Sequence, residues 1–291
     1  MGYCNRVVHA SALALALSLA SSIAGSARAD EEGPNRGRVS VSIGSDITTA
    51  YFFRGVLNER DGFIWQPYGD LNINLYAGDG AIRSVDAAFG AWASFQSEKT
   101  LATHDGPSNL YEVDYYPYLT IGLPYGLETS LSYILYTSPN GAFSTVQQFD
   151  WGIALDDSEW LGAFALNPAV IFSFELENTS FGDDEGGYFE LSLEPGVDVE
   201  LSEDYPLTFS VPLALGLSMY DYYETNSGDH TFGFFSFGLG ASLPLAFIPE
   251  DFGSWSTGLG INVLVLSDVL EDANEGDSPF PVGTWNLSME Y

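Results

Sequence analysis

The sequence predicts an all-β fold, an up-and-down antiparallel transmembrane β-barrel of about twelve strands. Three observations support this prediction. Apolar and polar residues alternate over long stretches. The connections between these stretches are alternately short and long. The chain starts with an apolar leader and ends with an alternating segment whose last residue is aromatic. The composition agrees, because 46% apolar residues, 15% aromatic residues and 31 glycines are typical of packed β structure.

The leader, residues 1–29, has the pattern of a cleaved secretory signal. Arg6 precedes an apolar core at 12–23, and Ala27-Arg28-Ala29 is a small-x-small cleavage site before Asp30. A membrane anchor is the alternative, but the apolar stretch is short for a spanning helix. We therefore expect residues 30–291 to be the barrel domain. Cys4, in the leader, is the only cysteine, so disulfides and thiolate chemistry are not expected in that domain.

The strands are predicted from strict alternation between two faces. From Phe189 to Leu201 the odd positions are Phe, Leu, Leu, Pro, Val, Val and Leu, whereas the even positions are mostly acids, Ser and Gly. Such a strand has one apolar face and one polar face. Read together with turn signals, the pattern gives twelve segments in order: 38–54, 63–77, 81–96, 109–123, 126–137, 145–156, 163–177, 187–201, 206–222, 231–246, 254–268 and 281–291.

The connections indicate how these segments are arranged. Short turns are expected at Gly78-Asp79-Gly80, Pro124-Tyr125, Asp157-Ser158-Glu159, Glu203-Asp204 and Pro249-Glu250-Asp251, whereas 98–108, 178–186, 224–230 and 269–279 are longer and polar. Short turns at one end and long loops at the other are the layout of an outer-membrane barrel. A soluble two-sheet sandwich also alternates, but its edge strands usually carry charged residues that are missing here.

Aromatic residues gather at the expected strand ends, as they do at membrane interfaces. We expect one ring on the short-turn side and a second on the long-loop side: Tyr125, Trp160, Tyr205, Trp255 and Tyr291, and opposite them Tyr51, Trp65, Phe95, Tyr111 and Tyr220. The last strand alternates through Trp285, Leu287, Met289 and Tyr291. This ending resembles the terminal signal by which the barrel-assembly machinery recognises outer-membrane proteins, so that machinery and outer-membrane lipid are expected partners.

The first strand pair resembles a known family. Ser45-Asp46 and Tyr51-Phe52-Phe53-Arg54-Gly55, followed by Gly62-Phe63-Ile64-Trp65-Gln66-Pro67, are similar to the opening of the TorF-type porins. The resemblance covers about residues 40–76 and implies an outer-membrane barrel classed as a channel.

The charge balance limits the partners that the protein can bind. Forty Asp and Glu stand against eight Lys and Arg, which excludes recognition of nucleic acid through phosphates. Strand parity turns many acids inward, and a water-filled interior is expected because unpaired buried carboxylates are costly. The candidate lumen-lining residues are Asp46, Arg54, Asp70, Asp86, Glu112, Asp114, Glu128, Asp150, Glu175, Glu190, Glu194 and Asp198.

Catalysis is not expected, and no cofactor is expected either. After the leader only His104 and His230 are present, and no Ser lies two residues after either of them. Asp229-His230 is better explained as part of a polar loop. Acids in the long loops, among them Asp183, Asp184, Asp272 and Asp277, offer oxygen ligands for calcium, although none fits a calcium-loop motif and a solvated acidic rim explains them as well.

These features predict a porin-like passive channel in the bacterial outer membrane, with an acidic lumen that favours cations among small solutes. A plugged barrel whose acidic loops bind a ligand, polymer or partner is the alternative. An outer-membrane hydrolase is a third possibility, disfavoured by the histidine count.

Overall fold

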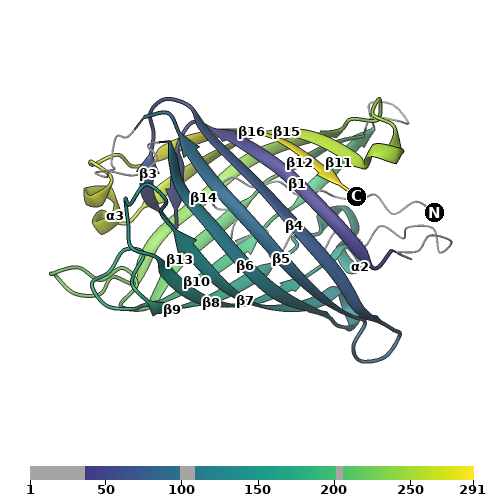
Figure 1. The fold of residues 1–291 in the computed structure, drawn as a ribbon, viewed down its shortest axis with the longest axis horizontal. Helices are drawn as coiled ribbons and strands as arrows, with labels where there is room; N and C mark the ends of the chain where they lie inside the picture. Colours follow the sequence, from purple (N-terminus) through teal and green to yellow (C-terminus); the bar gives the residue numbers. More distant parts are fainter. Residues whose placement is uncertain (1–36, 99–108, 201–205) are drawn as a thin grey trace.

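The computed structural model describes residues 37–98, 109–200 and 206–291. Its long strands form one antiparallel sheet that closes into a barrel, with the strands tilted against the barrel axis (Figure 1). Closure is complete because β14 pairs with both β13 and β15, and the first strand pairs with the last. The expected leader, residues 1–29, lies outside the described residues.

Fourteen strands make the wall: β1 (Val39–Thr48), β4 (Ile64–Ala77), β5 (Ser84–Gln96), β6 (Leu110–Gly122), β7 (Leu127–Thr137), β8 (Val146–Leu155), β9 (Ala169–Glu177), β10 (Gly187–Leu193), β11 (Gly196–Glu200), β12 (Pro206–Ser210), β13 (Leu213–Tyr220), β14 (Phe232–Pro244), β15 (Ser254–Leu266) and β16 (Phe280–Glu290). β10 and β11 are two halves of one membrane-crossing segment, interrupted at Pro195, and β12 and β13 are two halves of the next, interrupted at Pro212. The wall is therefore a closed, antiparallel barrel of twelve strands, which confirms the predicted fold class.

The alternation seen in the sequence becomes the two faces of this wall. In β10, Tyr188, Glu190 and Ser192 are buried, whereas Leu191 between them is exposed. Exposed apolar side chains cover the outside of the other strands in the same way: Ile43, Leu71, Phe89, Leu131, Trp151, Phe235, Leu239 and Ile261 are examples. A closed sheet with an apolar outer face satisfies its backbone hydrogen bonds internally, as hydrocarbon surroundings require.

The two ends of the barrel differ as predicted, with one correction. Figure 1 places the C-terminus and α2 (Ser158–Leu161) at one end, and α3 (Asp268–Ala273) at the other. We refer to these as the periplasmic and outer ends, because outer-membrane barrels have short periplasmic turns and long external loops. The turn expected at Asp157-Ser158-Glu159 is longer than predicted, since α2 and η2 (Gly162–Phe164) lie in it and β9 starts only at Ala169. Two further short turns contain η1 (Pro124–Gly126) and η3 (Glu250–Phe252).

The first segment is also shorter than predicted. β1 ends at Thr48, and the residues expected to continue it form a separate hairpin of β2 (Tyr51–Phe53) and β3 (Val56–Glu59). No helix in the described ranges is long and apolar enough to span a membrane.

The aromatic rings at the barrel ends are only partly as expected. Tyr125, Trp160 and Tyr291 are exposed near the periplasmic end. Near the outer end, Trp65 stacks on Phe95 on the membrane-facing surface of the barrel. Tyr51 and Tyr111 were expected on the outside, but both are buried in the barrel interior. The reason is that Tyr51 belongs to the hairpin, whereas Tyr111 is the extra residue of a β-bulge in β6, opposite Ser94 and Phe95, where the regular alternation is interrupted. Tyr205 lies outside the described residues.

Candidate functional site in the barrel interior

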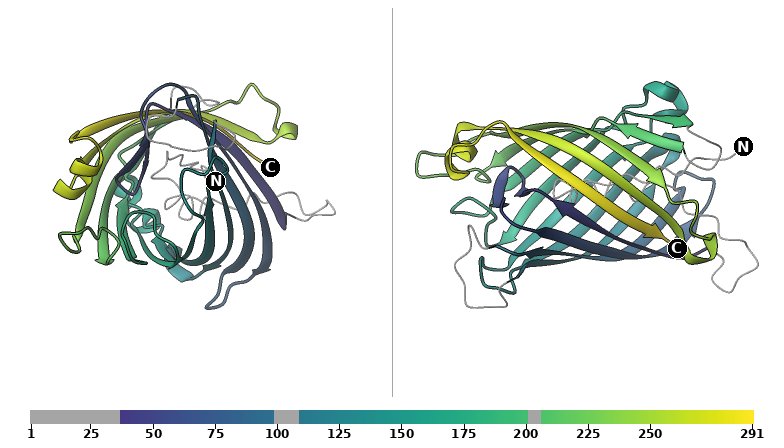
Figure 2. Two further views of the ribbon diagram at one scale, coloured as in Figure 1. Left: turned by 60° about the vertical axis from the view of Figure 1, so that its left-hand side comes forward. Right: turned by 90° about the horizontal axis from the view of Figure 1, so that it is seen from above.

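The outer half of the interior is occupied by the connection between β1 and β4, residues 49–63, which we call the inner hairpin. Its rings pack against inward side chains from opposite parts of the wall: Tyr51 lies 5.4 Å from Trp92 of β5, Phe52 lies 5.0 Å from Phe280 of β16 and Phe53 lies 5.2 Å from Tyr136 of β7, all between ring centroids. Because these partners come from three separate regions of the barrel circumference, the hairpin crosses the lumen rather than extending outward from the rim. Figure 2 shows the barrel from two further directions.

Arg54 is at the tip of the inner hairpin and is buried. Its guanidinium donates hydrogen bonds to Gln148 Oε1 at 2.8 Å in β8 and to Ser173 Oγ at 2.7 Å in β9. It also donates to the Tyr222 hydroxyl at 3.1 Å and lies 4.2 Å from the centre of the Tyr188 ring. Rings and neutral acceptors therefore surround the cation, which is how guanidinium groups are accommodated away from water.

Carboxylates provide the charge balance of Arg54. Asp150 Oδ2 lies 4.0 Å from the Arg54 guanidinium, and Gln148 Nε2 donates to the other oxygen of Asp150 at 2.6 Å. Glu190 is also buried nearby and accepts a short hydrogen bond from the Tyr188 hydroxyl. The tip of the hairpin is thus tied to β8, β9 and β10 by one charged network.

The backbone of the hairpin is held by the outer loops. Asn274, buried just after α3, donates from Nδ2 to the Gly55 carbonyl at 2.7 Å and accepts at Oδ1 from the Leu57 N–H at 2.8 Å. The Tyr223 hydroxyl donates to the Arg54 carbonyl at 2.8 Å. Gly55 has φ +83°, and a Cβ there would lie 2.7 Å from a methyl carbon of Leu270, so both its conformation and its packing require glycine.

The sides of the hairpin are held as well. The Tyr51 hydroxyl donates to Glu112 Oε2 at 2.7 Å, with Asp114 beside Glu112 on β6. Arg60 pairs with Glu275 and, at 2.7 Å, with Asp277 in the α3 loop. Two clusters of buried apolar residues surround the hairpin, one including Phe52, Phe234 and Leu264 and the other including Ile64, Ile134 and Tyr136.

The periplasmic half of the interior has a different lining of small and acidic residues. Asp86 accepts from Asn74 Nδ2 at 2.8 Å, Asp70 accepts from the Tyr118 hydroxyl at 3.3 Å, and Asp198 accepts from Thr208 Oγ1 at 2.7 Å. Inward positions nearby in β14 and β15 are Gly238, Gly240, Gly258 and Gly260.

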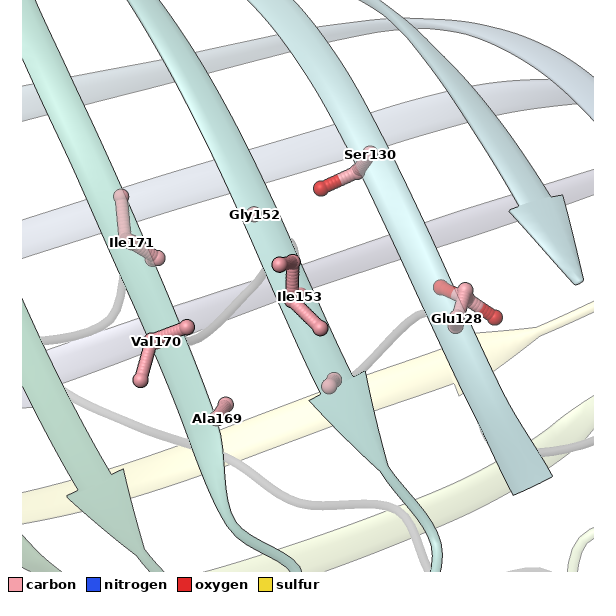
Figure 3. Close-up of a pocket in the computed structure, with 8 residues that line it drawn as sticks. Glu128, Ser130, Gly152, Ile153, Ala169, Val170 and Ile171 are labelled. Carbon is pink, nitrogen blue, oxygen red and sulfur yellow. The ribbon is translucent and has the colours of Figure 1, made fainter. Parts of the chain in front are cut away.

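Figure 3 shows part of this lining, where Glu128 and Ser130 of β7 lie beside Gly152 of β8 and Ile171 of β9. The crevice between these strands has a volume of about 10 Å³, which is about the space of a single water molecule. The three strands are therefore packed closely along this part of the wall.

The predicted lumen-lining residues fall into three levels. Asp70, Asp86, Glu128, Glu194 and Asp198 have inward positions in the periplasmic half, Asp46 lies opposite Gln66 and Asn286 near the middle, and Glu112, Asp114, Asp150 and Glu190 lie around the hairpin. Glu175 is different: its carboxylate accepts from the backbone N–H groups of Ser180 and Gly186, so it holds the β9–β10 loop.

Two expectations about the interior require correction. Arg54 was expected on the first strand, but it lies at the tip of the hairpin with φ +48°. A water-filled interior was expected throughout, but aromatic and aliphatic side chains pack the outer half. Period-2 alternation indicates which residues point inward; it does not indicate that a loop will fold back among them.

The acids of the described outer-loop residues are spread over several loops. Among the described residues there is no group of three or more His, Cys, Asp or Glu side chains that could hold a metal ion. Asp183 and Asp184 approach Glu224, whose pKa is raised by desolvation and then by the charges of Asp221 and these two neighbours. Arg60 neutralises Asp277 in another loop. This geometry is that of a charged rim.

The residues of the expected assembly signal lie along β16. Trp285, Leu287 and Met289 alternate on its outer face, and the Trp285 indole donates to Thr257 Oγ1 at 3.0 Å. Tyr291 exchanges backbone hydrogen bonds with Val41 of β1. The last residue thus takes part in the seam that closes the barrel.

Comparison with known proteins finds distant similarity of fold. No family model and no curated protein matches the chain. Among solved structures, the NanC porin shares 10% identity with a TM-score of 0.42, over 86% of this chain and 98% of its own. An outer-membrane channel from Pseudomonas putida F1 shares 10% identity with a TM-score of 0.45, over 87% and 96%. Outer membrane phospholipase A from Escherichia coli shares 14% identity with a TM-score of 0.36, over 86% and 91%.

The architecture defines the class of protein. A closed twelve-stranded barrel with an apolar exterior, short turns at the end that carries the C-terminus and long loops at the other end is a β-barrel of the bacterial outer membrane. One fold can host many unrelated functions, so the function of this protein is inferred from the residues of its interior.

Proposed function

We propose that this protein is a passive outer-membrane channel for small solutes that prefers cations and is constricted in its outer half by the inner hairpin. The observation that carries the proposal is the charge of the interior. Ten carboxylates have inward positions at three levels along the barrel, and among the described residues Arg54 is the cation that lies buried with them. The resemblance of residues 40–76 to the TorF-type porins supports the same function.

Acidic residues favour cations for an electrostatic reason. Carboxylates inside a wall of low dielectric constant concentrate the electric field and raise the local concentration of cations. Rings of Asp and Glu are the usual basis of cation selectivity in channels. Asp70 and Asp86 accept hydrogen bonds from Tyr118 and Asn74, which are uncharged side chains.

The inner hairpin determines the size of the path. Its rings and Arg54 span from β5 and β16 to β8 and β9, so any path through the outer half must pass beside it or require its displacement. We expect a small single-channel conductance, or brief openings, rather than the steady large conductance of an open pore.

The packing of the hairpin favours a second candidate function. Asn274, Tyr223 and Arg60 connect the hairpin to the outer loops. A permanently plugged barrel whose acidic loops bind a ligand, surface polymer or partner protein would need such connections to hold its loops in place.

A hydrolase is less well supported. His230 Nε2 lies 3.1 Å from Ser227 Oγ, but the hydrogen bond that Asp229, the acid next to His230, accepts comes from Ser218. A Ser–His pair acts as a nucleophile and base when a third group orients the base. We therefore propose that the protein is not an enzyme.

The proposal is tested by recording single channels from refolded protein in planar bilayers. Wild type is compared with a variant in which residues 50–61 are replaced by a short Gly-Ser linker. Channel function predicts cation-selective steps in dilute potassium chloride, with a conductance several-fold larger in the linker variant. Silent wild type with a conducting variant would support the plugged barrel, and two silent proteins that both show heat-modifiable barrels would contradict the channel proposal.

A further inference from the structure

An apolar groove of about 530 Å³ runs across the outside of the barrel near its periplasmic end. It extends from η2 across β11, β12 and β14 to β15, and its edges are outward-facing Phe209, Leu239 and Leu259. Leu239 and Leu259 are 64% and 66% exposed, so they stand out from the wall. Ala163 and Ala241 are the small outward residues between these edges.

The groove has a clear origin in the sequence. Ala241 pairs with Phe209 on one side and with Leu259 on the other, so a methyl group sits between two large side chains. The floor of the groove is formed by inward-facing glycines, which have no side chain on the inner face of the wall: Gly196, Gly240 and Gly260. A depression therefore forms where the wall is thinnest.

Two prolines weaken the wall beside the groove. Val211 N–H donates to the Pro195 carbonyl at 2.9 Å, and Gly238 N–H donates to the Pro212 carbonyl at 2.9 Å. Because proline has no N–H, the return bond of each pair cannot form. The seam between β11 and β12 and the seam between the β12–β13 segment and β14 thus each lack one ladder bond next to the groove.

We propose that this groove binds one acyl chain of a phospholipid from the periplasmic leaflet, and that the site prefers a lipid with an ammonium-bearing zwitterionic head group. Every outward side chain that lines it is apolar, and the surrounding medium at this face is hydrocarbon. An acyl chain matches this chemistry, and the span of the groove over four strands suits a long, flexible ligand.

The elements at the rim support a lipid with its head group on the periplasmic side. Trp160 and Phe164 are 57% and 83% exposed on the α2–η2 turn, and amphipathic or exposed rings of this kind belong at the membrane interface. The helical turn therefore places one end of the groove at the level of the head groups.

The charges at the same level determine the preferred head group. Glu159 of α2, which directly precedes η2, and Glu250 of η3, in the turn that joins β14 to β15, are exposed in the periplasmic turns next to the strands that line the groove. No Lys or Arg follows Lys99 in the sequence, so basic residues of the later strands cannot attract an anionic lipid at this site. Carboxylates without basic neighbours repel anionic head groups and attract an ammonium group.

The experiment is native mass spectrometry of the detergent-refolded barrel mixed with phosphatidylethanolamine and phosphatidylglycerol. Wild type is expected to retain one phosphatidylethanolamine molecule per barrel. Ala241→Phe fills the groove and should lower this retention about tenfold, equivalent to the loss of about two buried CH₂ groups. Ala91→Phe, an outward alanine on β5 across the barrel, is the matched control and should retain lipid as wild type does.

Further variants distinguish a lipid site from a folding defect and from a contact between two copies of the chain. Ala163→Phe fills the groove from η2, outside any strand, and should act as Ala241→Phe does even if the strand variant assembles poorly. Glu159→Gln with Glu250→Gln should leave one lipid bound but remove the preference between head groups. Equal lipid retention by Ala241→Phe, Ala163→Phe and wild type would overturn the site, as would a wild-type dimer that Ala241→Phe converts to a monomer, since a second copy would then be the occupant.

Discussion

Arg54 brings a positive charge into a part of the barrel where Asp150 and Glu190 are also buried. Its hydrogen bonds to Gln148 and Ser173 connect the hairpin tip to two neighbouring strands, and the Tyr188 ring covers its face. Loss of the guanidinium would leave a buried carboxylate without its cation. Removing one partner of a buried ion pair lowers the free energy of unfolding by more than the pair itself contributes, because the remaining charge stays buried without a partner.

Arg54→Met is therefore expected to destabilise the protein by about 3–5 kcal/mol, because the partner carboxylates remain buried. Urea unfolding of the protein refolded into vesicles measures this change. Arg60→Met, which breaks pairs at the exposed rim with Glu275 and Asp277, is the control and should cost about 0–1 kcal/mol. Equal effects of the two substitutions would show that the hairpin tip contributes little.

A second residue-scale prediction concerns the outer face. Leu213 pairs with Phe237 on the membrane side of β13, whereas Ser210 points inward in β12. Leu213→Arg should destabilise the barrel by about 2–4 kcal/mol, because it places a charge at the hydrocarbon face. Leu213→Ile and Ser210→Asn should be tolerated. A neutral Leu213→Arg combined with a severe Ser210→Asn, measured by the same unfolding assay, would mean that the two faces are reversed.

At the scale of elements, β16 closes the barrel by pairing with both β1 and β15. Its outward residues Trp285, Leu287 and Met289 continue the apolar exterior, and Tyr291 bonds to Val41 at the seam. The strand that carries the expected assembly signal is thus also the strand that completes closure.

Deleting Tyr291, or changing it to Asp, should lower the amount of folded protein in the outer membrane while leaving export unchanged. The measurement is the heat-modifiable barrel band in outer-membrane and periplasmic fractions. Tyr125→Asp, at an exposed aromatic residue in another periplasmic turn, is a control for the loss of an interfacial ring. Wild-type amounts of barrel after deletion of Tyr291 would show that the last residue is not part of the signal.

At the scale of the whole molecule, the interior has two parts, a packed outer half around the inner hairpin and a periplasmic half lined by small residues and acids. In the proposed channel, the first part would set the size of the path and the second would contribute most of its acidic lining. Salt should weaken the effect of the charge, because the Debye length falls from about 30 Å at 0.01 M to about 3 Å at 1 M.

Cation preference should therefore be strong in dilute potassium chloride and weak in concentrated salt. The reversal potential across a planar bilayer under a salt gradient measures it in both regimes. Glu194→Gln together with Asp198→Asn removes two charges from the periplasmic half and should reduce the preference in dilute salt. Glu159→Gln with Glu250→Gln, in the periplasmic turns outside the interior, is the matched control. Anion selectivity or no selectivity in dilute salt would contradict the proposed role of the acids.

The sequence by itself determined the barrel class and the direction of most side chains. Strand pairing has a strict period of two, so Tyr188, Glu190 and Ser192 of β10 had to face the interior once Phe189 and Leu191 faced the membrane. The same rule placed Leu213 outside and gave the number of crossings, because each crossing needs a long alternating segment between turns.

Only the tertiary structure decided what fills that interior. The alternation of β1 gives no sign that residues 49–63 turn back into the lumen, because their path depends on contacts with Trp92, Ser173 and Asn274, which are distant in the sequence. The same holds for Glu175, whose parity is inward but whose carboxylate binds loop amides. Local periodicity determines the wall of a barrel, whereas the contents of its lumen depend on long-range packing that no local pattern records.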